Sequence, residues 1–293
     1  MILWVGIAGA KCVNHGNRVI ERSVEVLTGA SDFTYHSLWN LAHFAVPDDL
    51  SGVLIPGCTT LGEPALQQFF QRLPENVPAY VLGGCFWDKY HRRRLGPNPD
   101  VLARPNIHIG SRDPYTITVL GERGIVTPLV GCPTVRYNPN PALETPSFPL
   151  VISFGRQTLP DDFWGNARSK YGDWSTWGVL LHEGVDKNHL PPEFPGTILR
   201  LFDMDPDDVF KVYQKAGQVI SGRLHGVLPS AGRVPTLYYG DRRDTRNTLL
   251  DALGINYGPP EWVLGESPTL QTPKEMPEFQ PFLEEMREGL GLT

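Results

Sequence analysis

Short apolar runs alternate along this chain with segments whose apolar residues recur at helical spacing. The first run, residues 2–8, is followed by a helical pattern at 18–27, and a second run at 52–55 is followed by another at 63–73. The remaining apolar runs of the first half lie at residues 77–82 and 106–110. Strands that alternate with helices favour a parallel sheet covered by helices. This alternation therefore predicts an α/β fold.

Prolines divide the pattern into two series. Five of them stand between residues 133 and 149, where a helix cannot propagate. After them, Asp205-Pro206 places a cap residue before a proline at the first helical position, the clearest helix start in the chain. The strands expected in this second series lie at residues 150–154, 177–181, 197–202, 218–221 and 236–239.

The two series predict two α/β domains with a cleft between them. We place the N-terminal domain at residues 1–140 and the C-terminal domain at 150–257. Residues 258–293 form a Pro-rich tail, which we expect to run as extended coil over the surface before a closing helix. Ligands of such folds bind beyond the carboxyl ends of the strands, so the cleft is the natural site.

Composition narrows the class of protein. The 293 residues are 41% hydrophobic, which supports a folded core and argues against disorder as the overall state. The formal net charge of −6 argues against a general nucleic-acid binder. No apolar stretch approaches the roughly 18 residues of a membrane span. The four cysteines are far apart and make no disulfide framework, which favours a reducing, cytoplasmic compartment.

Two polar groups stand where a strand is expected to pass into a helix. Ser221-Gly222-Arg223-Leu224-His225-Gly226 contains an arginine that can bind phosphate or carboxylate and a histidine that can move protons near neutral pH. Gly110-Ser111-Arg112-Asp113 is the second group, in which Asp113 precedes Pro114 as a helix cap. The alternative for the first group is structural: a buried arginine and histidine that satisfy loop carbonyls. In the second group a structural role is favoured for Asp113, whereas the charge of Arg112 opposes the positive end of the helix, a conflict that a bound anion would resolve.

Weaker candidates follow other strands. Asn14-His15-Gly16-Asn17 comes after the first strand, where Asn14 and Asn17 could contact a substrate or cap a helix. Gly57 and Gly84 could let a ligand approach the backbone. Cys12 and His15 have a ligand-like spacing, but no second pair completes a metal site, and we predict none.

The two polar groups resemble motifs of the polysaccharide pyruvyl transferase family. Residues 219–226 are similar to the family's strand that ends in Arg-Leu-His followed by glycine. Residues 110–113, with Thr116, resemble its Arg-Asp/Glu segment, and residues 14–17 stand at its N-terminal turn. The resemblance extends loosely over residues 1–255, and only the segments at 110–113 and 219–226 are specific.

The resemblance implies two Rossmann-like domains in a GT-B-like arrangement, and transfer of pyruvate from phosphoenolpyruvate onto a saccharide as a ketal. The acceptor would be a saccharide or a lipid-linked saccharide, and no cofactor would be needed. Carried over by motif, Arg112 and Arg223 bind the donor, the Leu224 backbone amide assists, and His225 acts as the general acid or base.

Two other functions fit the same residues. The first is a GT-B-type glycosyltransferase that uses a nucleotide sugar, because Arg and His in a cleft suit a diphosphate equally well. The second is a carbohydrate- or nucleic-acid-binding protein that kept the fold without catalysis. The donor that binds separates pyruvyl transfer from glycosyl transfer, and measurable turnover separates both enzymes from a binding protein.

Overall fold

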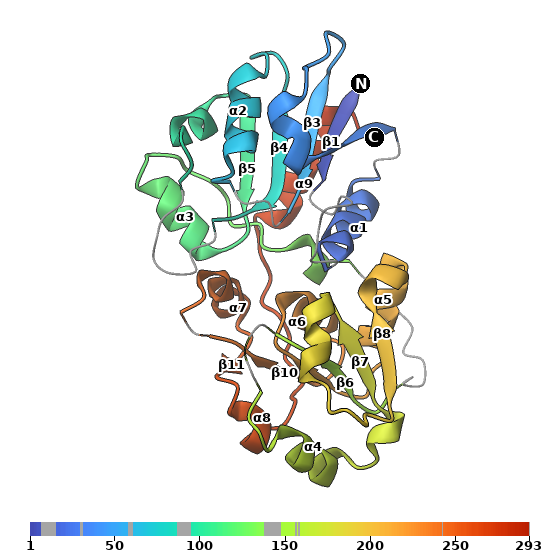
Figure 1. Cartoon of the computed structure of the whole chain (residues 1–293). Coiled ribbons are helices and arrows are strands. Elements are labelled where there is room, and N and C mark those ends of the chain that lie inside the picture. The colour runs from blue at the N-terminus through green and yellow to red at the C-terminus, as the bar shows by residue number, and fades with distance from the viewer. Residues whose placement is uncertain are drawn as a thin grey trace.

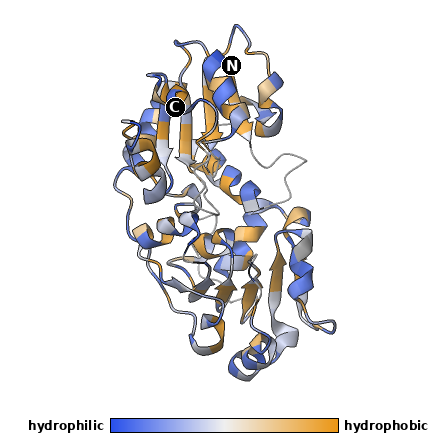
Figure 2. Ribbon diagram, turned by 60° about the vertical axis from the view of Figure 1, so that its left-hand side comes forward, coloured by the Kyte–Doolittle hydropathy of each residue, from blue (hydrophilic) through white to orange (hydrophobic). Residues whose placement is uncertain are grey.

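The protein folds into two parallel β-sheets, each covered by helices, one above the other in Figure 1. This confirms the predicted pair of α/β domains. The computed structural model describes residues 1–6, 16–29, 32–57, 61–86, 95–137, 148–155, 157, 159–241 and 243–292. Apolar residues gather along the strands and on the helix faces turned toward them (Figure 2).

The N-terminal sheet has the strand order β2-β1-β3-β4-β5, with every pair parallel. Its strands are β1 (Ile2–Gly6), β2 (Phe33–Ser37), β3 (Gly52–Pro56), β4 (Ala79–Gly84) and β5 (Ile107–Ser111). Its helices are α1 (Gly16–Thr28), α2 (Pro64–Arg72) and α3 (Pro114–Gly121). The direction of winding reverses between β1 and β3, which makes the carboxyl ends of these strands a natural ligand position.

The C-terminal sheet has the order β11-β10-β9-β6-β7-β8 and is also parallel. Its strands are β6 (Val151–Ser153), β7 (Gly178–Leu181), β8 (Thr197–Arg200), β9 (Val219–Ser221), β10 (Thr236–Tyr239) and β11 (Tyr257–Gly258). Its helices are α4 (Phe163–Tyr171), α5 (Pro206–Gln214), α6 (Leu224–Ser230), α7 (Thr248–Leu253) and α8 (Trp262–Gly265). The winding reverses between β6 and β9. This order is that of a dinucleotide-binding Rossmann sheet.

Short 3₁₀ helices connect many of these elements. They are η1 (Leu38–His43), η2 (Pro99–Ala103), η3 (Pro133–Val135), η4 (Trp174–Thr176), η5 (Gly184–His189), η6 (Leu201–Asp203) and η7 (Thr245–Asn247). The expected helix start at Asp205 is confirmed, because its carboxylate accepts a hydrogen bond from the Asp207 amide and Pro206 begins α5.

The tail differs from the expected surface coil. It contains α8, buries Met276 and ends in α9 (Phe279–Leu290), which lies against the N-terminal sheet (Figure 1). Phe282 of α9 meets Tyr80 of β4 edge to face at 6.2 Å, and Leu290 packs over Gly52 of β3. The end of the chain thus packs on the first domain. There α9 covers the apolar face of the N-terminal sheet on the same side as α1.

One apolar cluster joins the two domains. It contains Trp4 and Leu54 of the first sheet, Met286 of α9, and Leu228 and Leu250 from helices of the second domain. A polar contact reinforces it. Arg22 of α1 binds Asp207 of α5 through Nε and Nη2, each at 3.0 Å. The two domains therefore share part of their core.

Replacing Phe282 by alanine tests the role of α9. Phe282 is buried, so Phe282→Ala should lower the free energy of unfolding by about 3–5 kcal/mol through lost burial and the cavity left behind. Glu284→Ala, on the exposed side of the same helix, should change it by less than about 0.5 kcal/mol. Denaturant unfolding of both variants measures this, and equal stabilities would show that α9 does not belong to the core.

Candidate functional site

The carboxyl ends of the two sheets face each other across the domain junction. Gly16, at the start of α1, lies against His225, which follows β9: a Cβ on Gly16 would stand 2.2 Å from the imidazole Nδ1. Only glycine fits there, because a side chain would displace the ring. Figure 1 shows the junction between the N-terminal sheet above and the C-terminal sheet below. Residues that follow strands of both domains therefore meet.

Arg112 and Asp113 form the N-terminal side of the junction. The Asp113 carboxylate caps α3 by accepting hydrogen bonds from the Thr116 amide at 2.9 Å and the Thr116 hydroxyl at 2.8 Å. Arg112 donates to the same carboxylate from Nε and Nη2, at 3.2 and 3.1 Å. Burial raises the pKa of Asp113, and the Arg112 charge opposes that rise. The predicted cap is confirmed, and it also fixes the plane of the Arg112 guanidinium.

Arg223 is held inside the C-terminal domain. Its Nε donates to the Phe154 carbonyl at 2.7 Å, and its two Nη atoms donate to Glu183 at 2.9 Å and Asp186 at 2.6 Å. The side chain is 8% exposed. These bonds tie the end of β9 to the ends of β6 and β7. Direct donor binding by Arg223 stays a prediction, and its observed role is to hold the strand ends together.

His225 is buried and neutral. Its ring stacks at 22° on that of His182, with 6.1 Å between the centroids, and Gly16 at the start of α1 lies against it. The pKa of His225 is lowered to about 3. Burial is the largest cause, and the charges of Arg223, Arg246 and Arg112 contribute the rest. A negative ligand among these arginines would raise the pKa again.

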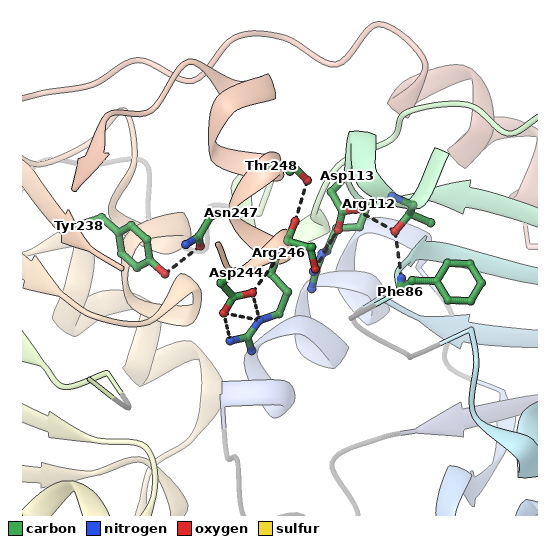
Figure 3. Close-up of polar contacts among 10 residues, drawn as sticks. Phe86, Arg112, Asp113, Tyr238, Asp244, Arg246, Asn247 and Thr248 are labelled. Carbon is green, nitrogen blue, oxygen red and sulfur yellow. Dashed lines mark hydrogen bonds and ion pairs between the residues drawn. The ribbon is translucent and has the colours of Figure 1, made fainter. Parts of the chain in front are cut away.

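Arg246 is the residue that sequence reasoning missed. It follows β10, in η7, and Asp244 holds it through Nε at 2.9 Å and through a second contact at Nη2. Figure 3 shows Arg246 and Arg112 in the same part of the junction, and the Arg112 charge acts on the Arg246 guanidinium. The charged run at residues 241–246 directly after a strand was the available signal, because carboxyl ends of parallel strands carry ligand-binding loops.

The other predicted residues occupy less decisive positions. Leu224 is the first residue of α6 and half-buried, and Asn17 is the second residue of α1. Gly57 and Gly84 are buried: a Cβ would stand 2.6 Å from the Leu82 carbonyl oxygen in the first case and 2.9 Å from Val81 in the second. Close strand packing accounts for both glycines, and their contact with substrate stays a prediction. Asn14 lies outside the described residues, as do Cys12 and His15.

A buried polar network supports His225 from behind. The Nε2 of His182 lies 2.9 Å from the Ser153 hydroxyl and 2.8 Å from the Tyr213 hydroxyl. The His182 backbone amide donates to Asp186, the same carboxylate that binds Arg223. One network therefore fixes both the Arg223 clamp and the ring that stacks on His225.

The described part of the chain contains no group of three or more His, Cys, Asp or Glu residues arranged to hold a metal ion. In the same residues, no helix is long and apolar enough to cross a membrane. The side chains of the junction offer two guanidinium groups from opposite domains that can bind an anion, and a neutral imidazole that can accept a proton.

Comparison with known proteins identifies the architecture. No family model and no curated protein sequence matches this chain. The UDP-GlcNAc 2-epimerase of Methanocaldococcus jannaschii, solved with UDP-GlcNAc and UDP, has a TM-score of 0.55 at 12% identity, over 98% of this chain and 99% of the other.

Two further solved structures are similar. The Neisseria meningitidis UDP-GlcNAc 2-epimerase, bound to UDP-GlcNAc, gives 0.54 at 10% identity over 100% of both chains. The S. aureus protein MnaA with UDP gives 0.56 at 10% identity, over 100% of this chain and 97% of that one. These likenesses, with the two parallel sheets, establish the GT-B fold of two Rossmann-like domains.

Replacing His225 tests its burial. Because the pKa of His225 is lower in the folded protein than in the unfolded chain, only the unfolded chain binds a proton at this residue between pH 6.5 and 3. The contribution of neutral His225 to the free energy of unfolding is therefore complete above pH 6.5 and is lost as pH falls toward 3. Between pH 7.5 and 5 the wild type should lose about 2 kcal/mol more than His225→Gln. Denaturant unfolding at several pH values measures this difference.

The exposed residue His43 provides the control. His43→Gln should follow the wild type over the same range, because it leaves His225 and its surroundings unchanged. Parallel pH curves for His225→Gln and wild type would contradict the burial of a neutral His225.

Proposed function

We propose that this protein is an enzyme that modifies saccharides and binds the phosphate of an activated donor between its two domains. The observation that carries the proposal is that Arg112, from the N-terminal domain, and Arg246, from the C-terminal domain, both lie near enough to a neutral His225 for their charges to lower its pKa. Planar guanidinium groups bind phosphate oxygens in pairs. A donor that engages both arginines would also draw the two domains together over the reacting atoms.

A nucleotide sugar is the donor that the fold likeness supports. The similar structures from Neisseria and Methanocaldococcus are named as complexes with UDP-GlcNAc. From these structures we take only the class of donor. For the present chain we propose glycosyl transfer from a nucleotide sugar onto a saccharide. In that reaction a bond forms between the acceptor oxygen and the sugar's anomeric carbon, and the bond from that carbon to the diphosphate breaks.

Phosphoenolpyruvate is the second candidate donor, and the Arg-Leu-His segment at 223–225 favours it. Pyruvyl transfer would protonate the enol carbon, add an acceptor hydroxyl at the neighbouring carbon and expel phosphate as a second hydroxyl closes the ketal. This donor carries a phosphate and a carboxylate, so two arginines suit its charges.

Both reactions give His225 and the arginines the same tasks. The imidazole takes the proton of the attacking hydroxyl, a step that becomes easier when donor phosphate raises the pKa of His225 from its low value in the free protein. Arg112 and Arg246 stabilise the charge that develops on the departing phosphate. Arg223 acts through its bonds to Glu183 and Asp186, which keep the segment that carries His225 in place.

Replacing Arg246 tests the proposal. Arg246→Gln and Arg112→Gln should each weaken donor binding by about 10- to 150-fold, the loss of 1.5–3 kcal/mol that a charged hydrogen bond contributes. Calorimetric titration with UDP-GlcNAc and, separately, with phosphoenolpyruvate measures this and shows which donor class binds. Arg243→Gln, an exposed residue of the same loop, should bind the donor as the wild type does.

Two outcomes would overturn the proposal. One is a wild type that binds neither class of donor. The other is a pair of variants, Arg246→Gln and Arg112→Gln, that fold and bind as tightly as the Arg243→Gln control.

A further inference from the structure

A second cleft lies along the outer side of α1, apart from the arginine site. It has a volume of about 470 Å³, within the range of small-ligand sites. Its walls are the aromatic residues of β1 and β2, the polar face of α1 and the start of α5 in the other domain. Both domains therefore build this cleft, as they build the arginine site.

Aromatic rings form one wall. Phe33 of β2 stacks on Trp4 of β1 at 24°, with 4.6 Å between the ring centroids. Tyr35, two residues along the same strand, is 45% exposed although it lines the cleft. Trp4 is buried and supports Phe33 from below, whereas the flat ring of Tyr35 is exposed and can take the apolar face of a sugar ring.

Tyr35 also connects the cleft to the carboxyl edge of the sheet. Its ring lies over Gly6, the last residue of β1, where a Cβ would stand 2.3 Å from the tyrosine hydroxyl. Gly16, the first residue of α1, touches His225, and Arg18, two residues further along the same helix, lines the cleft. A molecule in the cleft therefore lies beside the helix turn that contacts His225.

The charges of the opposite wall select against an anion. Two arginines and four carboxylates line the cleft, and the carboxylates belong to Glu21, Glu25, Asp205 and Asp207. Arg22 is already paired with Glu25 and Asp207, so the negative charge is in excess. Carboxylate oxygens accept hydrogen bonds from hydroxyl groups, whereas a phosphate or a sugar acid would be repelled.

We propose that this cleft binds the neutral saccharide acceptor, with a sugar ring stacked on Tyr35 and its hydroxyls donating to the carboxylates of α1 and α5. The inference rests on the proposed function, because it supplies the acceptor for the donor held by Arg112 and Arg246. The division of charge explains how one junction distinguishes its two substrates: the arginine site takes the anion and the acidic aromatic cleft takes the neutral sugar.

A glycan microarray with neutral and anionic oligosaccharides tests the inference on the 293-residue chain. The wild type should bind neutral glycans and discriminate against their sialylated or phosphorylated counterparts. Tyr35→Ala should weaken binding to the best neutral glycan by about tenfold or more in a titration, because the stacking surface is lost. Tyr35→Phe keeps the ring and should stay within about threefold of the wild type.

Donor binding and stability separate the possible failures. All Tyr35 variants should keep the wild-type melting temperature and the wild-type affinity for UDP-GlcNAc or phosphoenolpyruvate, whichever binds. A protein that binds donor but no neutral glycan, or a folded Tyr35→Ala that binds glycans as the wild type does, would overturn the acceptor cleft alone. A protein that binds no donor would overturn the proposed function instead.

Discussion

A neutral imidazole buried beside arginines is the constraint on which the domain junction depends. Protonating His225 would place a fourth positive charge among Arg112, Arg223 and Arg246 in surroundings that water does not screen, and its pKa is accordingly low. The three arginines can lie close to one another because each has a carboxylate partner. Asp113 pairs with Arg112, Asp244 with Arg246, and Glu183 and Asp186 with Arg223. The packing of α1 on the imidazole, possible only through Gly16, closes the site from the N-terminal side.

The same constraint links the two domains to function. Arg112 and Arg246 stand on different sheets, so an anion between them would bind both domains at once. The shared apolar cluster and the Arg22–Asp207 contact already hold the domains together without ligand. The Arg22 guanidinium lowers the pKa of the Asp207 carboxyl, which keeps this contact ionised. Substrate binding would then adjust an existing junction instead of assembling one.

Local patterns made most of the fold predictable, and contacts between distant residues made the rest unpredictable. The strand at 236–239 and the Asp205 cap follow from short-range periodicity and capping chemistry, and both are confirmed. The placement of Arg112 and His225 at the junction followed from the rule that ligands bind beyond the carboxyl ends of strands, in the cleft between two such domains.

The Arg223 clamp to Glu183 joins residues 40 positions apart, which no local pattern reveals. The return of α9 to the first sheet likewise depends on which face of that sheet lacked a cover. The prolines at 258–281 predicted extended chain over the surface, but they carried no information about α8 or about the packing of Met276 and α9 on the first domain.

The most direct test of the central claim is the protonation state of His225 with and without donor, followed by NMR of the imidazole nitrogens. The resonances are assigned by their absence from His225→Gln, since the chain has eight histidines. From pH 5 to 8, His225 of the free protein should remain neutral. With saturating donor, UDP-GlcNAc or phosphoenolpyruvate, its resonances at the acid end of this range should move toward those of imidazolium, because bound phosphate among the arginines raises the pKa, while near pH 8 the ring should stay neutral and able to accept a proton. Unchanged His225 resonances under saturation would contradict an anion site at the junction.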